Sequence, residues 1–284
     1  MKEQVRNLFA ILGIFAILLI VVGGLVFFFH APEKTEAPPE EGDQLSYSFS
    51  TPGILEETGS LRESSSPYWW VNSGGALVLT DGIGTTFEDE LPASHHWRKE
   101  YARTNPGDTE DGAHPQNVFR LISKFSWENV RFEGRFRIGA DNLSESPNRN
   151  ETNGIFLMSR YEDEDDFYYA GMRVDGDAVI KKKYDGTYYT LAQVHVFPGS
   201  YDRTENPNLL PKDTWIDMRS ETVTEGDTVT IRLYLRDERA NAWREVLKAT
   251  DDGSETPPLL EASHVGVRTD FMDVAFDAFL IEEI

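Results

Sequence analysis

The stretch NGIFLMSRYEDEDDFYYAGMRVDGDAVIKKKYDGTYYTLA, residues 153–192, decides the fold class of this chain. It contains three runs rich in aromatic and β-branched residues, at 167–174, 177–184 and 187–193. Asp175-Gly176 and Asp185-Gly186 separate these runs, and Asp-Gly readily adopts the positive φ angles of tight hairpin turns. The stretch therefore predicts a meander of antiparallel strands.

The same period of two continues on both sides of this stretch. Residues 130–138 alternate apolar and charged side chains, and further runs occupy 214–223, 228–236, 264–268 and 271–281. In the last run we expect one face to carry Met272, Val274, Phe276, Ala278 and Leu280. No window longer than a turn or two has helical periodicity. We therefore expect an all-β, two-sheet antiparallel jelly-roll sandwich over residues 44–284.

The N-terminus differs from the rest of the chain. Residues 8–29 carry no charge and would span about 30 Å as a helix, the thickness of a bilayer core. Lys2 and Arg6 precede this run, and the acidic, Pro-rich residues 30–43 follow it. The positive-inside rule predicts a cytoplasmic stub at 1–7, a transmembrane helix in the lipid bilayer at 8–29, a linker at 30–43 and an extracytoplasmic domain. A cleaved signal peptide is the alternative, but the run is long for one and ends in three Phe residues.

Composition excludes several classes of protein. The 284 residues include 49 acidic and 27 basic side chains, giving a net charge of −22, and no Cys. A nucleic-acid partner is not expected, because such proteins neutralise phosphates with a basic surface. Disulfide scaffolds, thiolate metal sites and a cysteine nucleophile are excluded as well.

The order of these features resembles the concanavalin A-like lectin and glucanase superfamily, in particular its laminin-G-like jelly rolls. The segments that carry the resemblance are 67–85 (PYWWVNSGGALVLTDGIGT), 127–138 (WENVRFEGRFRI), 153–192, 215–219 with 228–235, and 264–281 (HVGVRTDFMDVAFDAFLI). The resemblance implies a sandwich whose concave sheet or loop rim meets a glycan, often with calcium. A fold alone does not fix a function.

Aromatic and cationic side chains are the candidate ligand-binding residues. Sugar rings have apolar C–H faces that stack on aromatic rings, and guanidinium groups bind hydroxyls and carboxylates. Because strand neighbours point to opposite faces, one residue of each adjacent aromatic pair is expected in the core. The candidates are Tyr68, Trp70, Trp97, Arg160, Tyr161, Tyr169, Arg173 and Tyr188.

Carboxylates supply the candidate metal and catalytic groups. Asp108, Glu110 and Asp111 lie in the loop 104–117, and clustered oxygens of this kind suit calcium. The acidic run 162–166 fits a solvated hairpin turn best, with calcium binding or glycosidase chemistry as alternatives. The run does not match the catalytic pattern of the glucanases, so no catalytic residue is assigned.

Arg131, Arg135 and Arg137 share one strand face and permit two interpretations. They pair with acidic residues of a neighbouring strand, such as Asp273 and Asp277, or they bind an acidic glycan. We favour the pairing, because an unpaired row of Arg residues repels itself.

These observations together predict a membrane-anchored, extracytoplasmic module that binds carbohydrate, assisted by calcium. The alternatives are a glycoside hydrolase or polysaccharide lyase that uses the same cleft, and a structural or protein-binding surface domain.

Overall fold

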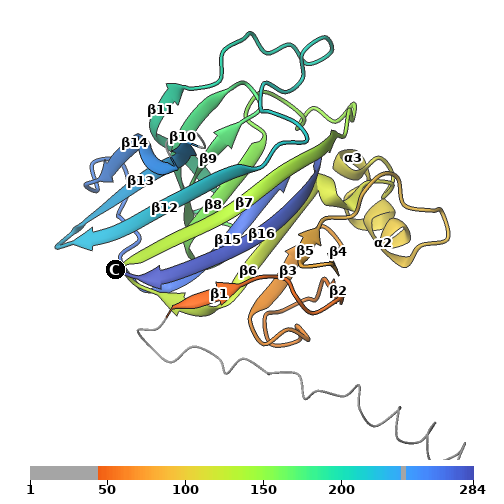
Figure 1. Cartoon of the computed structure of the whole chain (residues 1–284), viewed down its shortest axis with the longest axis horizontal. Helices are drawn as coiled ribbons and strands as arrows, with labels where there is room; N and C mark the ends of the chain where they lie inside the picture. The colour runs from red at the N-terminus through yellow and green to blue at the C-terminus, as the bar shows by residue number, and fades with distance from the viewer. Residues whose placement is uncertain (1–43, 238–240) are drawn as a thin grey trace, which may run out of the picture. The chain divides into compact units, whose positions relative to one another are not determined.

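Two antiparallel sheets stack face to face (Figure 1) in the computed structural model, which describes residues 44–237 and 241–284. Sheet A contains, in spatial order, β14 (Ala242–Asp251), β13 (Thr228–Asp237), β12 (Ile216–Glu225), β7 (Val130–Asp141), β16 (Met272–Glu283), β5 (Ile83–Thr85), β4 (Ala76–Thr80) and β2 (Gly53–Glu56), with β1 (Leu45–Tyr47) paired to β16. Sheet B contains β11 (Thr187–His195), β10 (Asp177–Tyr184), β9 (Phe167–Arg173), β8 (Gly154–Tyr161), β15 (Ser263–Asp270), β6 (Val118–Trp127) and β3 (Trp69–Ser73). The all-β two-sheet sandwich is confirmed.

The meander is formed as the sequence predicts. Strands β8, β9, β10 and β11 pair in chain order, and Gly176 (φ 84°), Asp185 (φ 46°) and Gly186 (φ 75°) take the positive φ angles that the two Asp-Gly turns require. Alternation sends Ile155 and Leu157 of β8 into the core between the sheets. This alternation also decides which side chains of sheet B remain for its outer face.

The expected face of the last strand is wrong in its second half. The register of β16 shifts between Asp277 and Leu280, where Ala278 adopts a positive φ of 49°. A bulge of this kind inserts a residue and reverses the direction of every side chain beyond it. Ala278 is therefore exposed, and Phe279 is buried in the core in its place.

One region is helical although no helix was expected. The 9-residue helix α2 (His96–Thr104), the short helix α3 (Pro106–Thr109) and the 3₁₀ turn η1 (Pro115–Asn117) precede β6. Helix α2 is mostly polar and buries only Tyr101, so its apolar pattern is too weak for sequence periodicity to reveal it.

The stub, the transmembrane segment and the linker predicted for residues 1–43 lie outside the described residues. Among residues 44–237 and 241–284, no helix is both long and apolar enough to cross a membrane.

A buried ion pair joins the two sheets. Lys182 of β10 points inward, is 1% exposed, and its Nζ lies 2.6 Å from the Asp251 carboxylate at the end of β14. The hydroxyl of Tyr168 donates to the same carboxylate at 2.6 Å, and Lys182 also donates to the carbonyl oxygen of Thr256 at 2.8 Å. These hydrogen bonds offset the desolvation free energy of burying the two charges.

Replacing Lys182 by Met tests this pair. We expect Lys182→Met to lower the free energy of unfolding by about 3–5 kcal/mol, because it leaves the Asp251 carboxylate buried without its counter-charge. Urea denaturation measures the change. Lys248→Met, at an exposed position of β14, is the control. A similarly small effect of both substitutions would contradict the assignment.

Candidate functional site

The outer face of sheet B carries a second apolar cluster, separate from the main core. We call it the outer aromatic cluster. Every residue of β8 and of β9 is buried, so both faces of these two strands are covered by other atoms. The cluster consists of Ile122, Phe156, Met158, Tyr161, Phe167, Tyr169 and Val179, with Trp70 packed against it.

Sheet B curls around this cluster. The Arg268 guanidinium on β15 donates to the hydroxyl of Tyr188 on β11 at 2.9 Å, although β10, β9 and β8 lie between the two strands. Four strand spacings of about 4.8 Å would separate β11 from β15 by about 19 Å in a flat sheet, too far for these two side chains to meet. The outer face of sheet B is therefore concave.

Glycine permits this curvature. A Cβ atom at Gly171 would lie 2.1 Å from the carbonyl oxygen of Ile155, and one at Gly154 would lie 2.0 Å from that of Met172. Gly266, in the neighbouring strand β15, is similarly crowded by the carbonyl oxygen of Leu121 at 2.6 Å. Any side chain at these positions would push adjacent strands apart.

Gly171→Ala tests the curvature. We expect the substitution to destabilise the domain by about 1–3 kcal/mol or more, since the added methyl group overlaps a backbone carbonyl that cannot rotate away. Thermal unfolding measures the loss. Gly53→Ala is the matched control, because a Cβ there has no neighbour within 4 Å. Equal stability of the two variants would contradict the curvature argument.

Charged groups surround a hollow of about 150 Å³ on this face. Arg268 lies 2.8 Å from Asp270, and Lys183 lies 2.9 Å from Asp165. The second oxygen of the Asp270 carboxylate, Oδ2, has no hydrogen-bond partner among the described residues, although Asp270 is only 4% exposed. Arg120, Glu164, Phe167 and Tyr188 complete most of the lining.

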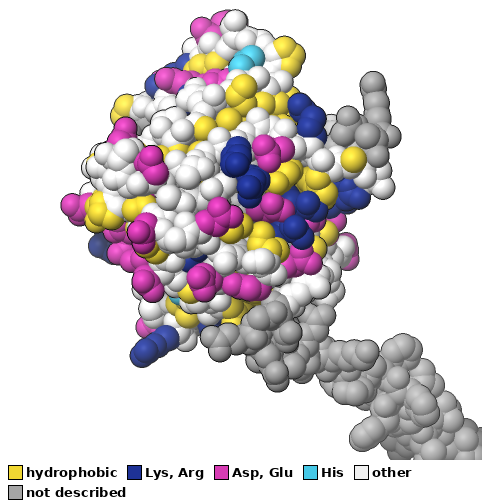
Figure 2. Space-filling view, turned by 90° about the vertical axis from the view of Figure 1, so that its left-hand side faces the viewer, with side chains coloured by type: hydrophobic (Ala, Val, Ile, Leu, Met, Phe, Trp, Pro, Cys, Tyr) yellow, Lys and Arg dark blue, Asp and Glu magenta, His cyan; other side chains and the backbone are white. Residues whose placement is uncertain are grey.

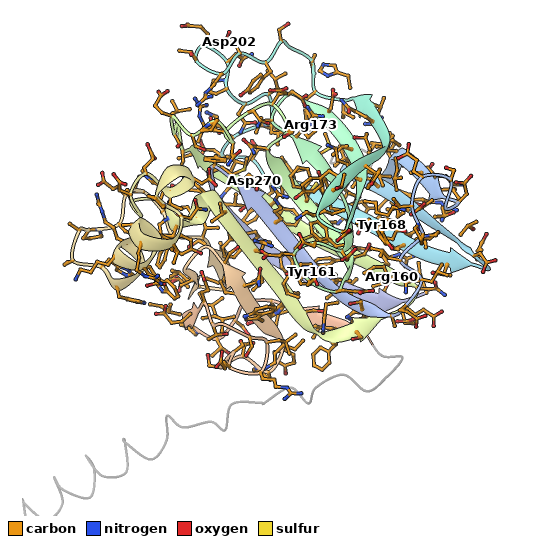
Figure 3. All side chains as sticks on the ribbon, turned by 180° about the vertical axis from the view of Figure 1, so that it is seen from behind. Arg160, Tyr161, Tyr168, Arg173, Asp202 and Asp270 are labelled. Atoms are coloured by element: carbon orange, nitrogen blue, oxygen red, sulfur yellow. The ribbon has the colours of Figure 1, made fainter. Side chains whose placement is uncertain are left out.

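Five of the eight predicted ligand-binding residues lie on this face: Trp70, Tyr161, Tyr169, Arg173 and Tyr188. Figure 3 looks onto this side of the molecule and places Tyr161, Arg173 and Asp270 over sheet B. Tyr188 is 43% exposed, whereas Tyr169 lies beneath it with the ring centroids 6.1 Å apart. Burial raises the pKa of the Tyr169 hydroxyl, and the charge of Arg268 opposes the increase.

The other three predicted residues lie elsewhere. Arg160 is 0% exposed and donates to the carbonyl oxygen of Leu260 at 2.9 Å and to Thr224 at 2.7 Å, so its guanidinium supports the interior. Tyr68 belongs to the core between the sheets, and Trp97 packs on α2 against Phe87 and Leu91. Strict alternation would point Arg160 outward with Phe156 and Met158, and the positive φ of 51° at Arg160 interrupts that alternation.

Sequence reasoning missed several groups that the fold brings to this face, chiefly Arg120, Phe156, Arg268 and Asp270. A usable signal existed for Arg268 alone, which ends the predicted run 264–268. Asp270 lies between the two predicted runs, and β15 extends to Asp270 in the structure, so the two side chains share a face. Nothing in the local sequence indicated which face that is, because the neighbouring strands β8 and β9 are buried on both sides.

The calcium ligands predicted in the loop 104–117 do not converge. Asp108 accepts hydrogen bonds from Ser146 and Asn148, while Glu110 lies 2.7 Å from His114. Within the described residues, no three His, Asp or Glu side chains gather as a metal site would require. These residues do not fit a calcium ion. The acidic run 162–166 forms the exposed turn between β8 and β9, as a solvated turn predicts.

Two of the three arginines on the outer face of sheet A, Arg131 and Arg135, form cross-strand ion pairs, whereas Arg137 lies over the ring of Trp215. Arg131 contacts Glu221 and Glu282, both at 2.9 Å, and Arg135 contacts Asp217 at 2.7 Å. Asp277 joins Arg135 as expected, whereas Asp273 instead accepts from Gln116 and Asn142. Figure 2 shows basic and acidic side chains lying next to one another on the side of the molecule it faces.

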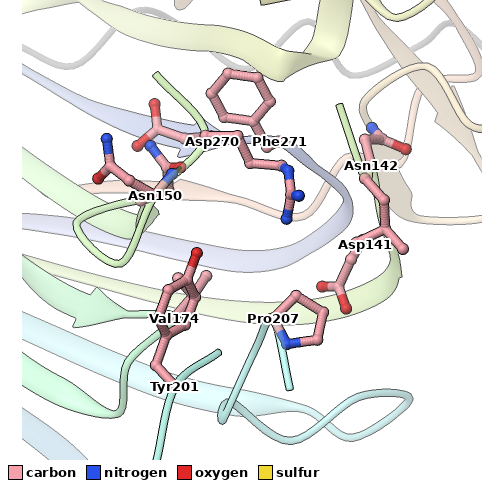
Figure 4. A pocket seen from close by; sticks show the side chains of 11 residues that line it. Asp141, Asn142, Asn150, Val174, Tyr201, Pro207, Asp270 and Phe271 are labelled. Carbon is pink, nitrogen blue, oxygen red and sulfur yellow. Dashed lines mark hydrogen bonds between the residues drawn. The ribbon is translucent and has the colours of Figure 1, made fainter. Parts of the chain in front are cut away.

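Two further hollows lie elsewhere on the described part of the chain. The rim pocket in Figure 4, where the loops 142–153 and 198–213 meet the β15–β16 turn, holds about 10 Å³, the room of a single water molecule. Its polar groups bind one another, as Asn208 does with Asp141 at 2.7 Å. A hollow of about 320 Å³ lies beside Trp215, whose ring the guanidinium groups of Arg135 and Arg137 approach within 5.3 and 5.0 Å.

His264 gives the outer face a pH-dependent contribution to stability. Burial lowers the pKa of His264 below 6.5, and the carbonyl oxygen of Phe125 at 3.2 Å opposes this only in part. As the pH falls through 6.5, His264 binds a proton in the unfolded chain before it does so in the folded chain, so the free energy of unfolding decreases.

We expect His264→Gln to remove this decrease, measured by urea denaturation at a series of pH values. The matched control is His96→Gln, on the exposed side of α2. An unchanged pH slope in His264→Gln would contradict this assignment.

Among the comparisons with known proteins, similarity is found with solved structures, and it concerns the fold. No protein-family model and no curated protein matches the sequence. A carbohydrate-binding module of Bacillus subtilis, CBM66, is 15% identical, with 76% of this chain and 95% of that chain covered and a TM-score of 0.43. A winged bean acidic lectin, solved with methyl-α-D-galactose, is 9% identical, with 84% and 98% covered and a TM-score of 0.48.

A prokaryotic β-1,3-1,4-glucanase from a mouse hindgut metagenome is also 9% identical, with 84% and 98% covered and a TM-score of 0.41. At such low identities and scores the likeness concerns the fold alone and assigns no ligand to this chain.

Proposed function

We propose that the concave outer face of sheet B binds carbohydrate without covalent chemistry. One observation carries the proposal: the 43% exposed ring of Tyr188 lies on a concave face beside the cationic groups of Arg268 and Lys183, which are hydrogen-bond donors. Such a site offers an apolar platform for a sugar ring and partners for its hydroxyl groups.

The buried floor of the site holds the ring of Tyr188 in place. Phe167 and Tyr169 pack edge-on against Tyr188, with ring centroids 6.5 and 6.1 Å from it, so the platform is held before any ligand arrives. A binding surface whose side chains are already ordered loses little conformational entropy when a ligand binds.

The two alternatives have weaker support. A retaining hydrolase needs two carboxylates about 5–5.5 Å apart across the scissile bond. Of the acids lining the hollow, Asp270 is engaged by Arg268, and Glu164 lies in the exposed turn. For a protein-binding domain we would expect a continuous apolar patch. The exposed large hydrophobic residues of the described chain are Ile54, Leu143, Tyr188, Val194 and Ile284. Tyr188 and Val194 both lie on β11, and the other three come from different parts of the chain, so the five form no continuous patch.

We also propose that residues 8–29 anchor this domain to a membrane, with residues 44–284 on the extracytoplasmic side. The support is the uncharged run itself and the basic residues before it. The acidic domain would be repelled by anionic lipid, so the anchor alone would hold it at the surface.

A polysaccharide array probed with the full-length chain in mild detergent tests the binding proposal. We expect retention on at least one polysaccharide, with and without calcium, and a loss of about tenfold or more in affinity for Tyr188→Ala, worth roughly 1.4 kcal/mol. Trp215→Ala, in the 320 Å³ hollow described above, is the control and should leave the affinity unchanged.

Three outcomes would contradict the proposal. Failure of every polysaccharide to retain the protein removes the function. Loss of affinity in Trp215→Ala but not in Tyr188→Ala moves the site to the other hollow. Release of reducing or unsaturated sugars by the protein favours the hydrolase or lyase.

A further inference from the structure

Lys181 is a half-buried cation whose charge no acidic side chain compensates. It points outward from β10, one residue before the inward-pointing Lys182. Among the described residues, its Nζ has neither a hydrogen bond nor an ion pair, and the ring centroid of Tyr188 lies 5.9 Å from it. Burial lowers the pKa of Lys181, and the nearby charges of Arg173 and Arg268 lower it further.

The next lysine on the same face of the strand provides an internal comparison. Lys183 also approaches the Tyr188 ring, at 5.2 Å, but its Nζ donates to the carbonyl oxygen of Glu164 at 2.6 Å and contacts the Asp165 carboxylate at 2.9 Å. Both neighbours of Lys181 are also satisfied, Arg173 by Asp175 at 2.6 Å and Arg268 by Asp270 at 2.8 Å. Of these four cations on the outer face of sheet B, Lys181 alone lacks an acidic partner among the described residues.

An uncompensated cation beside two others, on a partly desolvated face, costs folding free energy. The chain has a net charge of −22 and 49 acidic residues, so a surface carboxylate for Lys181 would be easy to provide. Groups held at such an unfavourable position commonly serve a ligand.

We infer that the carbohydrate bound by this face carries an acidic group, a carboxylate or a sulfate, and that this group lies against Lys181. The inference rests on the proposed function, because it names the class of sugar that the same face selects. Tyr188 places the two parts of the ligand: its ring contacts the sugar, and Lys181 lies beside that ring. Arg173 and Arg268 are already paired with Asp175 and Asp270, so Lys181 supplies the charge that the acidic group meets.

Two pairs of polymers that share a backbone test the inference with the full-length chain. Polygalacturonate is compared with its fully methyl-esterified form, and dextran sulfate with dextran, by retention in affinity electrophoresis. We expect the charged member of at least one pair to be retained and its neutral partner not. Because the protein as a whole is acidic, general charge attraction would not retain a polyanion. The first pair reports on carboxylates and the second on sulfates.

Variants at Lys181 locate the contact. We expect Lys181→Gln to weaken retention of the charged polymer about 10- to 100-fold, as for loss of a charged hydrogen bond, and Lys181→Arg to restore most of it. Lys248→Gln, which removes one positive charge from an exposed position on β14, should change nothing. Because the uncompensated charge costs folding free energy, we expect Lys181→Gln to be at least as stable as the parent chain in urea denaturation, and that result excludes a folding defect as the cause.

The possible failures are distinguishable. Equal retention of charged and neutral polymers, binding to neutral polysaccharides alone in the array, or full binding by Lys181→Gln each overturns the inference and leaves carbohydrate binding in place. Retention of no polysaccharide in either experiment overturns the proposed function itself.

Discussion

The curl of sheet B is the constraint on which the rest of the molecule depends. It brings Tyr188 on the edge strand β11 into contact with Arg268, which lies four strand positions away. Gly154, Gly171 and Gly266 make that approach sterically possible, since each lies against a backbone carbonyl where no Cβ would fit. Without the curl, the outer aromatic cluster would be an exposed apolar sheet face, which soluble domains avoid.

The three consecutive lysines of β10 show how a strand assigns identical residues to different tasks. Lys182 points inward and forms an ion pair with Asp251, which joins the two sheets. Lys183 points outward and is neutralised by the turn between β8 and β9. Lys181 points outward beside two arginines without a carboxylate of its own. Three identical side chains thus have different charge partners, because they point to different faces of the strand and lie beside different neighbouring segments.

Much of the fold could be predicted from the sequence, because local alternation of apolar and polar residues indicates the strands and Asp-Gly pairs indicate the turns between them. The meander 167–193 and the strand at 130–138 appear where that pattern placed them. The bulge at Ala278 could not be found in this way, since it depends on the register with β7. Helix α2 was missed because tertiary contacts of Tyr101 hold it, including a hydrogen bond to the backbone of Gly74.

The candidate site was predictable only in part, for a related reason. Composition and alternation identified Tyr169 and Tyr188 as candidates, and the fold places both on the concave face. The same rule failed for Arg160, because a positive φ angle at that residue reverses its direction. Pairing partners such as Asp270 come from a strand about 80 residues further along the chain, and no local pattern records which distant strands become neighbours.

The double burial of β8 and β9 divides the molecule into residues that can vary and residues that cannot. These strands form part of the interior on one side and the floor of the concave face on the other, so a substitution in Phe156 or Tyr169 alters packing and recognition together. Tyr188 and Lys181 lie on β11 and β10 at the edge of the same sheet, and neither is part of the core between the sheets. Descendants of this chain can therefore acquire new preferences through β10 and β11 while their inner strands stay fixed.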